Sequence, residues 1–421
     1  VSEGTIGTGT IWSTIKTQAP IYPVYFRGAD KKIMIDQWGE KMYDFAQKYD
    51  LNRGGGVGGN GIFSNKYRDS NTYGGSFTGS GYADFNIMEG LTFTVNGSLY
   101  KYDRRYTYVN SPFVDHYTSS NDNGSVSKGS YSTKTYNTQQ LLNYVKTFGL
   151  HDVSAMIGHE YYNYEYQSLS GSGWNFGIDN ATELNSLLNL NYPSSYSSRY
   201  NNEGFFFRGM YSYDSKYYGS FSIRRDASSR FHKDNRWGNF WSAGGAWVIS
   251  KEDFFDVDWI DMLKFKASIG SQGNDNIGSY RYADTYSIVN NNNEVAYQWN
   301  QKGTKDITWE TNTNINAGFE FELFKGRLSG SIDYFYRKTT NMLFSVPVTP
   351  SLGYTSYYDN IGDMANTGFE IVLNGDVIRT RDVVWSLNAN FTYVKNKVLK
   401  LPDPRKDRNI DGYAGFISGS N

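Results

Sequence analysis

The chain has 421 residues, and its 41 Lys and Arg balance 42 Asp and Glu to a formal net charge of −1. This balance lacks the basic excess of a nucleic-acid-binding protein, so we expect no nucleic-acid partner. Aromatic residues make up 17% of the chain, led by 37 Tyr, whereas Cys is absent. Such a composition favours a strand-rich protein, and the lack of Cys is compatible with export through the cell envelope.

The apolar residues form no run of about 18, so the sequence predicts no transmembrane helix. A mean hydropathy of −0.60 still suits a membrane β-barrel, because only alternate strand residues face lipid. The chain opens at Val1 without Met or a signal peptide, so we expect an internal part of a longer exported protein.

Residues 1–76 are predicted to form a long external region that precedes the barrel strands. A small hairpin is expected at 22–43, with turns marked by Ala29-Asp30 and Gly39. The Gly-rich run 53–61 lacks the Lys-Ser/Thr of a phosphate-binding loop, so we interpret it as a linker.

Residues 77–396 show the alternation of apolar and polar side chains that is typical of strands with two different faces. Leu91, Phe93 and Val95, for example, alternate with Thr92 and Thr94. The same pattern returns in four later segments: 263–269, 315–323, 328–334 and 385–393. A soluble antiparallel sheet with one wet face would also alternate, but many segments approach the ~9–11 residues that cross a bilayer.

The connections between these segments alternate between short and long, as in an outer-membrane barrel. Short connections are expected at 88–90, 148–151, 214–216 and 324–327, and long external ones at 108–130, 167–202, 271–306 and 339–364. Residues 250–261 are expected to form a longer turn with a short helix, and 376–383 to form a connection of intermediate length. The fold class is therefore an all-β, antiparallel transmembrane barrel with about twelve strands, and 397–421 begin the next external loop.

Charged and aromatic residues near the strand ends have both structural and functional interpretations. Arg224, Asp226 and Arg230 fit an ion-pair ladder, or rim contacts to a substrate or lid. Arg225 falls on the lipid side and is tolerable only at the membrane interface. Trp241 and Trp247 are interpreted as interfacial anchors.

Six residues are candidates for substrate binding. Tyr297, Trp299, Tyr354 and Tyr357 lie in external loops, where solvent-facing rings can stack on sugars. Asn274 and Asp275 follow the strand 263–270, either as turn residues or as polar groups at the inner mouth of the barrel.

The sequence predicts no catalytic, metal or cofactor site. His116, His151, His159 and His232 lack metal-site spacing. Asp407-x-Asn409-x-Asp411-Gly412 matches half a calcium loop, but Ser418 stands where Glu is expected, which favours a solvated loop. We therefore expect a protein that is not an enzyme.

An ordered series of blocks resembles the SusC/RagA-type family of TonB-dependent outer-membrane transporters. The strongest is Ser222-Ile223-Arg224-Arg225-Asp226-Ala227-Ser228-Ser229-Arg230-Phe231, followed by Lys233–Gly238, Gly245–Ser250 and Gly273–Gly278. Asp333–Thr340 and Asn360-Ile361-Gly362 continue the series, so the resemblance covers residues 70–405.

The resemblance implies the wall of a barrel of about 22 strands that imports oligosaccharides or peptides. It implies a SusD-like surface lipoprotein as a lid, and coupling to the TonB complex through a plug that this chain lacks. It also places the protein in the outer membrane of a Gram-negative bacterium, in contact with its lipid. A passive porin or an adhesin barrel is the alternative, and a soluble glycan-binding β protein is the third possibility.

Overall fold

The computed structural model describes residues 23–35, 39–44, 60–112, 123–178, 182–291 and 294–400. The chain divides into two compact units, and most strands from β1 to β6 have a part in each. The first unit holds Val1–Gly79, Leu99–Tyr136 and Tyr164–Arg199, and the second holds Ser80–Ser98, Asn137–Asn163 and Tyr200–Asn421. No helix in the described part of the chain is long and apolar enough to span a membrane.

Most of the described chain belongs to one sheet of 13 strands, whose path joins twelve of them in the order β1-β2-β3-β4-β6-β7-β8-β9-β12-β13-β16-β17. These strands are β1 (Arg68–Met88), β2 (Leu91–Asn110), β3 (Ser125–Phe148), β4 (His151–Phe176), β6 (Ser194–Tyr213), β7 (Tyr217–Ser228), β8 (Trp237–Val248), β9 (Ile260–Asn274), β12 (Glu310–Leu323), β13 (Leu328–Thr340), β16 (Asp363–Arg379) and β17 (Val384–Lys400). The short β5 (Leu187–Leu190) pairs with β4 off this path. Both the antiparallel fold class and the strand number of about twelve are confirmed.

Two faces with different chemistry result from the alternation along these strands. One outward row runs across five strands in register, through Phe265, Phe319, Ile332, Ile371 and Phe391. Its members remain accessible, with Phe319 43% exposed and Phe391 55% exposed. Because these side chains are accessible among the residues that the structure describes, the apolar face is free to contact lipid, as the sequence predicted.

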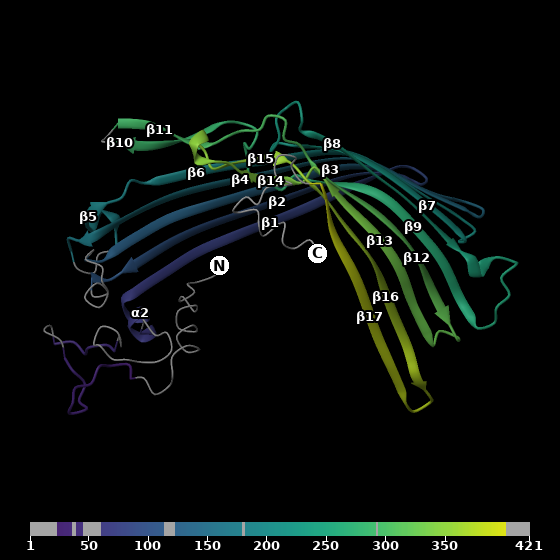
Figure 1. The fold of residues 1–421 in the computed structure, drawn as a ribbon, viewed down its shortest axis with the longest axis horizontal. Coiled ribbons are helices and arrows are strands. Elements are labelled where there is room, and N and C mark those ends of the chain that lie inside the picture. Colours follow the sequence, from purple (N-terminus) through teal and green to yellow (C-terminus); the bar gives the residue numbers. More distant parts are fainter. Residues whose placement is uncertain are drawn as a thin grey trace. The chain divides into compact units, whose positions relative to one another are not determined.

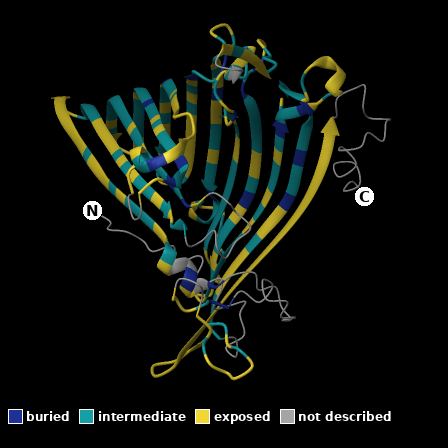
Figure 2. Ribbon diagram, turned by 90° about the vertical axis from the view of Figure 1, so that its left-hand side faces the viewer, coloured by how far each residue is buried: buried dark blue, intermediate teal, exposed yellow. Residues whose placement is uncertain are grey.

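The row directly beside it, on the opposite face, is polar. It runs through Lys266, Gly318, Asp333, Glu370 and Thr392 in the same five strands. Figure 2 shows the consequence for burial, since the long strands are banded in intermediate and exposed colours and dark blue is confined to short stretches. The sheet therefore has no continuous buried core of its own.

The short turns lie where the sequence placed them. Asp214 and Ser215 have φ of 52° and 50°, and Phe324 and Lys325 have φ of 59° and 57°. Left-handed residues in such turns match the twist of the flanking strands. After β8, η3 (Ile249–Lys251) forms the expected short helix, and the turn between β16 and β17 is narrower than expected, at 380–383.

The boundaries of the long connections differ from the prediction. β1 begins at Arg68 rather than at residue 77, and the connections shrink to 111–124, 177–193, 275–309 and 341–362. The connection 229–236 between β7 and β8 is short although it lies at the same strand ends as the long ones. The strands are longer than predicted because backbone pairing continues through polar stretches such as Arg68–Tyr73, where no alternation of apolar residues marks a strand.

Two of these connections carry hairpins of their own. β10 (Thr285–Asn291) pairs with β11 (Glu294–Gln301), and β14 (Leu343–Pro347) pairs with β15 (Ser356–Asn360). The short helix η4 (Pro350–Leu352) lies in the connection between β14 and β15. Figure 1 shows both hairpins at the strand ends opposite the short turns. A core of Phe231, Phe240, Ile277, Ile307 and Trp309 lies at their base, and each side chain is at most 8% exposed.

The first unit contains the small hairpin region expected near residues 22–43. Antiparallel bridges join Tyr25 to Tyr43, Arg27 to Ile33 and Ile35 to Lys41, while residue 22 lies outside the described residues. Tyr43 and Phe63 of α2 (Gly61–Tyr67) are buried together. A second small core joins Val126, Phe176 and Leu187, beside η2 (Leu184–Ser186).

Candidate functional site

The β10–β11 hairpin has one apolar face. The register pairs Tyr286 with Trp299 and Ile288 with Tyr297, so these side chains project from the same side, with Val295 next to them. Tyr297 is 73% exposed and Ile288 is 71% exposed. The other face is largely polar, with Ser287 opposite Gln298. A two-stranded hairpin that exposes an apolar face is an interaction surface rather than a core element.

Aromatic rings from both external hairpins meet. Trp299 of β11 stacks on Tyr354, with ring centroids 6.3 Å apart and planes inclined by 19°. Tyr286 also contacts the Trp299 ring edge-on, with ring centroids 5.3 Å apart. Tyr354 lies in the turn that leads into β15 and is half-buried. The structure thus joins two of the predicted residues, Trp299 and Tyr354, across 55 positions of sequence.

The bases of the two hairpins are linked by several polar contacts. A parallel bridge joins Lys302 to Tyr357, and the Thr304 hydroxyl donates to the carbonyl of Tyr358 at 2.5 Å. The Arg281 guanidinium lies 4.4 Å from the centroid of the Tyr358 ring and also donates to Gln301. Tyr357, the fourth predicted loop residue, therefore lies at this linked base rather than beside Trp299.

Asp284 closes the base of the β10–β11 hairpin. Its Oδ1 accepts the Gly303 N–H at 2.8 Å and pairs with the Lys302 ammonium at 3.3 Å. The backbone hydrogen bond from Gly303, with the nearby Lys302, holds the pKa of the Asp284 carboxyl below its usual value. The carboxylate therefore stays charged at neutral pH, which keeps these contacts in place.

Asn274 and Asp275 already have protein partners. The Asp275 carboxylate accepts the Tyr200 hydroxyl at 2.8 Å and the Ser228 hydroxyl at 2.6 Å, and the Arg230 guanidinium donates to the Asp275 carbonyl at 3.0 Å. The Asn274 amide donates to Glu310 at 3.1 Å. These contacts fix the strand end, as the turn interpretation of the sequence expects, and a sugar hydroxyl would have to compete with them.

The charged block around Arg224 forms an ion-pair ladder on the inward face. Arg224 donates to Asp226 at 2.7 Å and to Glu160 at 3.0 Å, and Arg230 pairs with Asp275 at 3.5 Å. Arg225 faces outward, where its guanidinium lies 5.0 Å from the Trp237 ring centroid. This arrangement bears out the structural interpretation of the block.

The two predicted tryptophan anchors share the outward face of β8. Trp241 is 42% exposed, and the Trp247 indole N–H donates to Glu252 at 2.9 Å. The Tyr217 hydroxyl also donates to Glu252. The hydrogen bond from Tyr217, and to a smaller extent that from Trp247, lowers the pKa of the Glu252 carboxyl. Trp247 thus has one apolar and one polar side, which suits a membrane interface.

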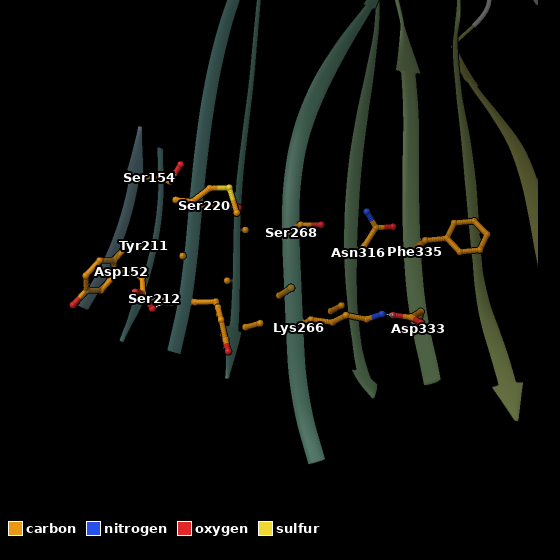
Figure 3. A pocket seen from close by; sticks show the side chains of 18 of the residues that line it. Asp152, Ser154, Tyr211, Ser212, Ser220, Lys266, Ser268, Asn316, Asp333 and Phe335 are labelled. Carbon is orange, nitrogen blue, oxygen red and sulfur yellow. Dashed lines mark hydrogen bonds and ion pairs between the residues drawn. The ribbon is translucent and has the colours of Figure 1, made fainter. Parts of the chain in front are cut away.

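A cavity of about 1020 Å³ lies against the inward face near the short turns. Figure 3 shows its polar lining, with Ser220, Ser268 and Asn316 from three different strands and the Lys266 ammonium reaching Asp333. That ion pair spans 3.0 Å, although β12 lies between the two strands that carry it. Gly318 occupies the register position between them and has no side chain to block the contact.

Glu320 completes this cluster of charges. Its carboxylate binds the Lys264 ammonium at 3.1 Å and the Lys266 ammonium at 2.9 Å. The cluster therefore pairs two cations with two anions, so the wall here offers hydrogen-bonding groups with little net charge.

Sequence reasoning missed this cluster and the apolar hairpin face. The face had a detectable signal, because two alternating runs, Tyr286-x-Ile288 and Val295-x-Tyr297-x-Trp299, flank the Asn-rich stretch 290–293, which is typical of a hairpin. The charge cluster had none, since it depends on pairing between distant strands. Within the described residues, no group of three or more His, Cys, Asp or Glu is placed to hold a metal ion. Residues 407–412 and His116 lie outside the described residues.

The comparisons with known proteins all indicate the same family. The family model described as TonB dependent receptor-like, beta-barrel matches residues 31–416. The TonB-dependent receptor P3 of Formosa agariphila is 34% identical over 277 residues, covering 63% of this chain and 27% of that protein. The TonB-dependent receptor SusC of Bacteroides thetaiotaomicron is 33% identical over 291 residues, covering 66% of this chain and 28% of that protein.

A solved structure extends the similarity to three dimensions. The RagAB peptide transporter matches with a TM-score of 0.77 and 27% identity, over 82% of this chain and 39% of the solved chain. The chain thus spans about a third of the length of these relatives.

Proposed function

This chain belongs to the TonB dependent receptor-like β-barrel family, and we propose that it forms part of the wall of an active importer of oligosaccharides or peptides. The observation that carries the proposal is the two-faced sheet. An apolar row through Phe319 faces outward, and polar groups such as Asn316 line the inward cavity. A polar solute crossing a lipid barrier needs such a wall. The assigned location is the outer membrane of a Gram-negative bacterium.

The external hairpins are the proposed site of first contact with the substrate. Trp299 stacks on Tyr354, and Tyr297 offers an exposed ring beside them. Aromatic faces bind the apolar faces of sugar rings and also peptide side chains. Tyr357 supports the base that links the two hairpins. Asn274 and Asp275 remain candidates for substrate binding, in which a substrate hydroxyl would replace one of their hydrogen bonds to the protein. We propose that residues 60–67, before β1, belong to an external region. β17 continues to Lys400, beyond the boundary at residue 396 that the sequence predicted, and the external loop expected after it lies outside the described residues.

We assign two partners to the complete protein, as the family resemblance implies. A SusD-like surface lipoprotein would cover the external hairpins, whose exposed apolar face at Ile288 and Val295 supports a protein contact. The TonB complex would supply energy through a plug domain. We propose neither a cofactor nor a catalytic reaction, because importers of this family move their substrate unchanged.

Uptake measurements with the complete protein test the proposal. Cells that produce it are given labelled oligosaccharides and peptides, with and without a protonophore. Active import predicts accumulation that stops when the proton-motive force is removed. Entry that continues unchanged would favour a passive porin, and surface attachment without entry would favour an adhesin.

A paired substitution tests the hairpin site. Trp299→Ala should reduce substrate affinity several-fold, since aromatic stacking contributes about 0.5–1.5 kcal/mol. Trp259→Ala is a matched control, because Trp259 stacks on Phe324 at the short turns, with centroids 5.6 Å apart and an angle of 22°. Equal effects of both substitutions, at equal protein level in the membrane, would remove the hairpin from substrate binding.

A further inference from the structure

Four tyrosines form a row across neighbouring strands of the first unit. Tyr106 of β2 stacks on Tyr131 of β3, with ring centroids 5.5 Å apart and planes inclined by 21°. Tyr131 in turn stacks on Tyr166 of β4 at 6.2 Å and 23°, and Tyr166 contacts Tyr196 of β6 at 6.2 Å. Because β2, β3, β4 and β6 are consecutive in the sheet, the row has one ring on each strand. With neighbouring strands about 4.8 Å apart, it spans roughly 15 Å.

The tyrosine row lies on the inward face of the sheet. Gln139 of β3 donates to Glu160 of β4, and Glu160 belongs to the inward ion-pair ladder. Tyr131 and Tyr166 lie on the same two strands at an even number of positions from these residues, so alternation directs them to the same face. The rings therefore face the lumen, where they are not anchors in lipid.

The opposite face of the same strand segments is polar. Lys101 pairs with Asp103 at 2.9 Å, and the Ser132 hydroxyl donates to Asp103 at 2.7 Å. Arg199 pairs with Glu165 at 3.6 Å. β3 and β4 have 24 and 26 residues, whereas ~9–11 residues cross a bilayer. Because a face with these charges does not suit lipid, we assign this part of the strands, with its tyrosines, to the external side of the membrane.

Arg104 adds a positive charge to the tyrosine row. It lies two positions before Tyr106 on β2, and its guanidinium is 6.0 Å from the centroid of the Tyr131 ring. The Arg104 Nε has no hydrogen-bond partner, and among the residues that the structure describes no carboxylate forms an ion pair with Arg104. A guanidinium has five N–H donors in a planar fork that matches an oxyanion. An anionic group that the protein does not supply can therefore bind here.

The surroundings of Tyr106 leave ring surface for a ligand. A Cβ added at Gly129 would lie 2.5 Å from the Tyr106 ring, so the Gly at this position of β3 makes room for the ring. Aromatic pairs across strands also stabilise a sheet. This row is not packed into a core, however, because Tyr196 is 60% exposed and Tyr108, which contacts the Tyr106 ring, is 40% exposed.

We propose that the tyrosine row and Arg104 bind an acidic oligosaccharide. The sugar rings lie along the tyrosines, and a carboxylate or sulfate group of the sugar accepts hydrogen bonds from the Arg104 guanidinium. An extended peptide is bound by backbone pairing at a sheet edge, whereas β2, β3 and β4 each already have two neighbouring strands. The inference rests on the proposed import function, because it names the class of substrate, and it adds a site distinct from that at Trp299.

Calorimetric titration of the complete protein in detergent tests this site. The probes are tetragalacturonate and its methyl ester, a sulfated galactose tetrasaccharide and its desulfated form, and tetraglutamate. At least one acidic tetrasaccharide should bind about tenfold or more tightly than its neutral form, because hydrogen bonds to charged groups are strong. Absence of this preference in both pairs would overturn the proposal. Tighter binding of tetraglutamate that depends on Arg104 would also overturn it, in favour of an acidic peptide.

Three variants separate the charge from the rings. Arg104→Gln should abolish the preference for the acidic form. Arg105→Gln is the matched control and should have no effect, because Arg105 is exposed and faces the opposite way on the same strand. Tyr196→Ala should weaken the acidic and the neutral forms alike by several-fold, since it removes a stacking surface.

Unchanged binding by Arg104→Gln, or an equal loss in Arg105→Gln, would overturn the proposal, with heat-dependent gel mobility as the check that each variant is folded. The titrations require neither TonB nor a proton-motive force. Entry that continues without the proton-motive force would therefore refute active import and leave these results intact. Active import without any preference for acidic sugars would refute the acidic site alone.

Discussion

Replacing Phe319 by Arg should destabilise the folded protein in lipid by about 2–4 kcal/mol. Phe319 belongs to the outward row, with Phe265 and Ile332 as its register partners. It lies about four residues from Leu323 at the short-turn end of β12, or about 10 Å into an apolar band about 25 Å tall. A charge at this depth has no water and no partner. The folding equilibrium should therefore fall by a factor between about 30 and 1000.

Asn316→Arg is the matched control on the same strand. Asn316 lines the inward cavity, where an added guanidinium remains in water. The assay is urea unfolding of the complete protein in lipid vesicles, followed by Trp fluorescence and by heat-dependent gel mobility. The control should differ from the wild-type protein by less than about 1 kcal/mol. Equal losses for the two variants, or a larger loss for Asn316→Arg, would refute the assignment of the two faces.

Three further predictions concern topology, packing and pH. On intact cells, a Cys that replaces Lys325 should be shielded from an impermeant thiol reagent, whereas a Cys that replaces Ser356 should react. The reverse result would invert the proposed orientation of the strands in the membrane. The chain has no native Cys that would react as well. Gly318→Val should cost about 1–3 kcal/mol in the same unfolding assay, because a Cβ there would lie 2.5 Å from the Ile332 carbonyl oxygen of β13. Gly219→Ala should be neutral, because a Cβ added at Gly219 would meet no atom within 4 Å. Glu252 has a lowered pKa, so its contribution to stability is complete above the ordinary carboxyl value of about 4.3 and is lost as pH falls through the lower folded value. Below about pH 4, the unfolding temperature of the wild-type protein should fall partly because Glu252 is protonated. Glu252→Gln should lack this part of the fall.

The fold was predictable because lipid imposes the same rule on every strand. Phe319 and Asn316 could be assigned to opposite faces from alternation alone, and the register confirms that Phe265, Ile332 and Phe391 share the outward face. The start of β1 at Arg68 was not predictable, since its first residues are paired in water-exposed regions where either face tolerates polar side chains.

The candidate site was less predictable because its contacts join distant segments. Trp299 and Tyr354 were both identified as exposed loop aromatics, but their stacking depends on two hairpins folded against a common core. The partners of Asp275 were also out of reach, because Tyr200 and Ser228 belong to β6 and β7. Periodicity reports which way a side chain points, and it does not report which remote residue it meets.

The linked bases of the two external hairpins set a condition for exchanging loops between related barrels. Lys302, Thr304 and Arg281 on one connection contact Tyr357 and Tyr358 on the other. A graft of residues 275–309 alone would keep the strands but lose these contacts, along with half of the aromatic pair. Both connections would have to move together, so that a new specificity is transplanted as one unit of two hairpins with their shared base.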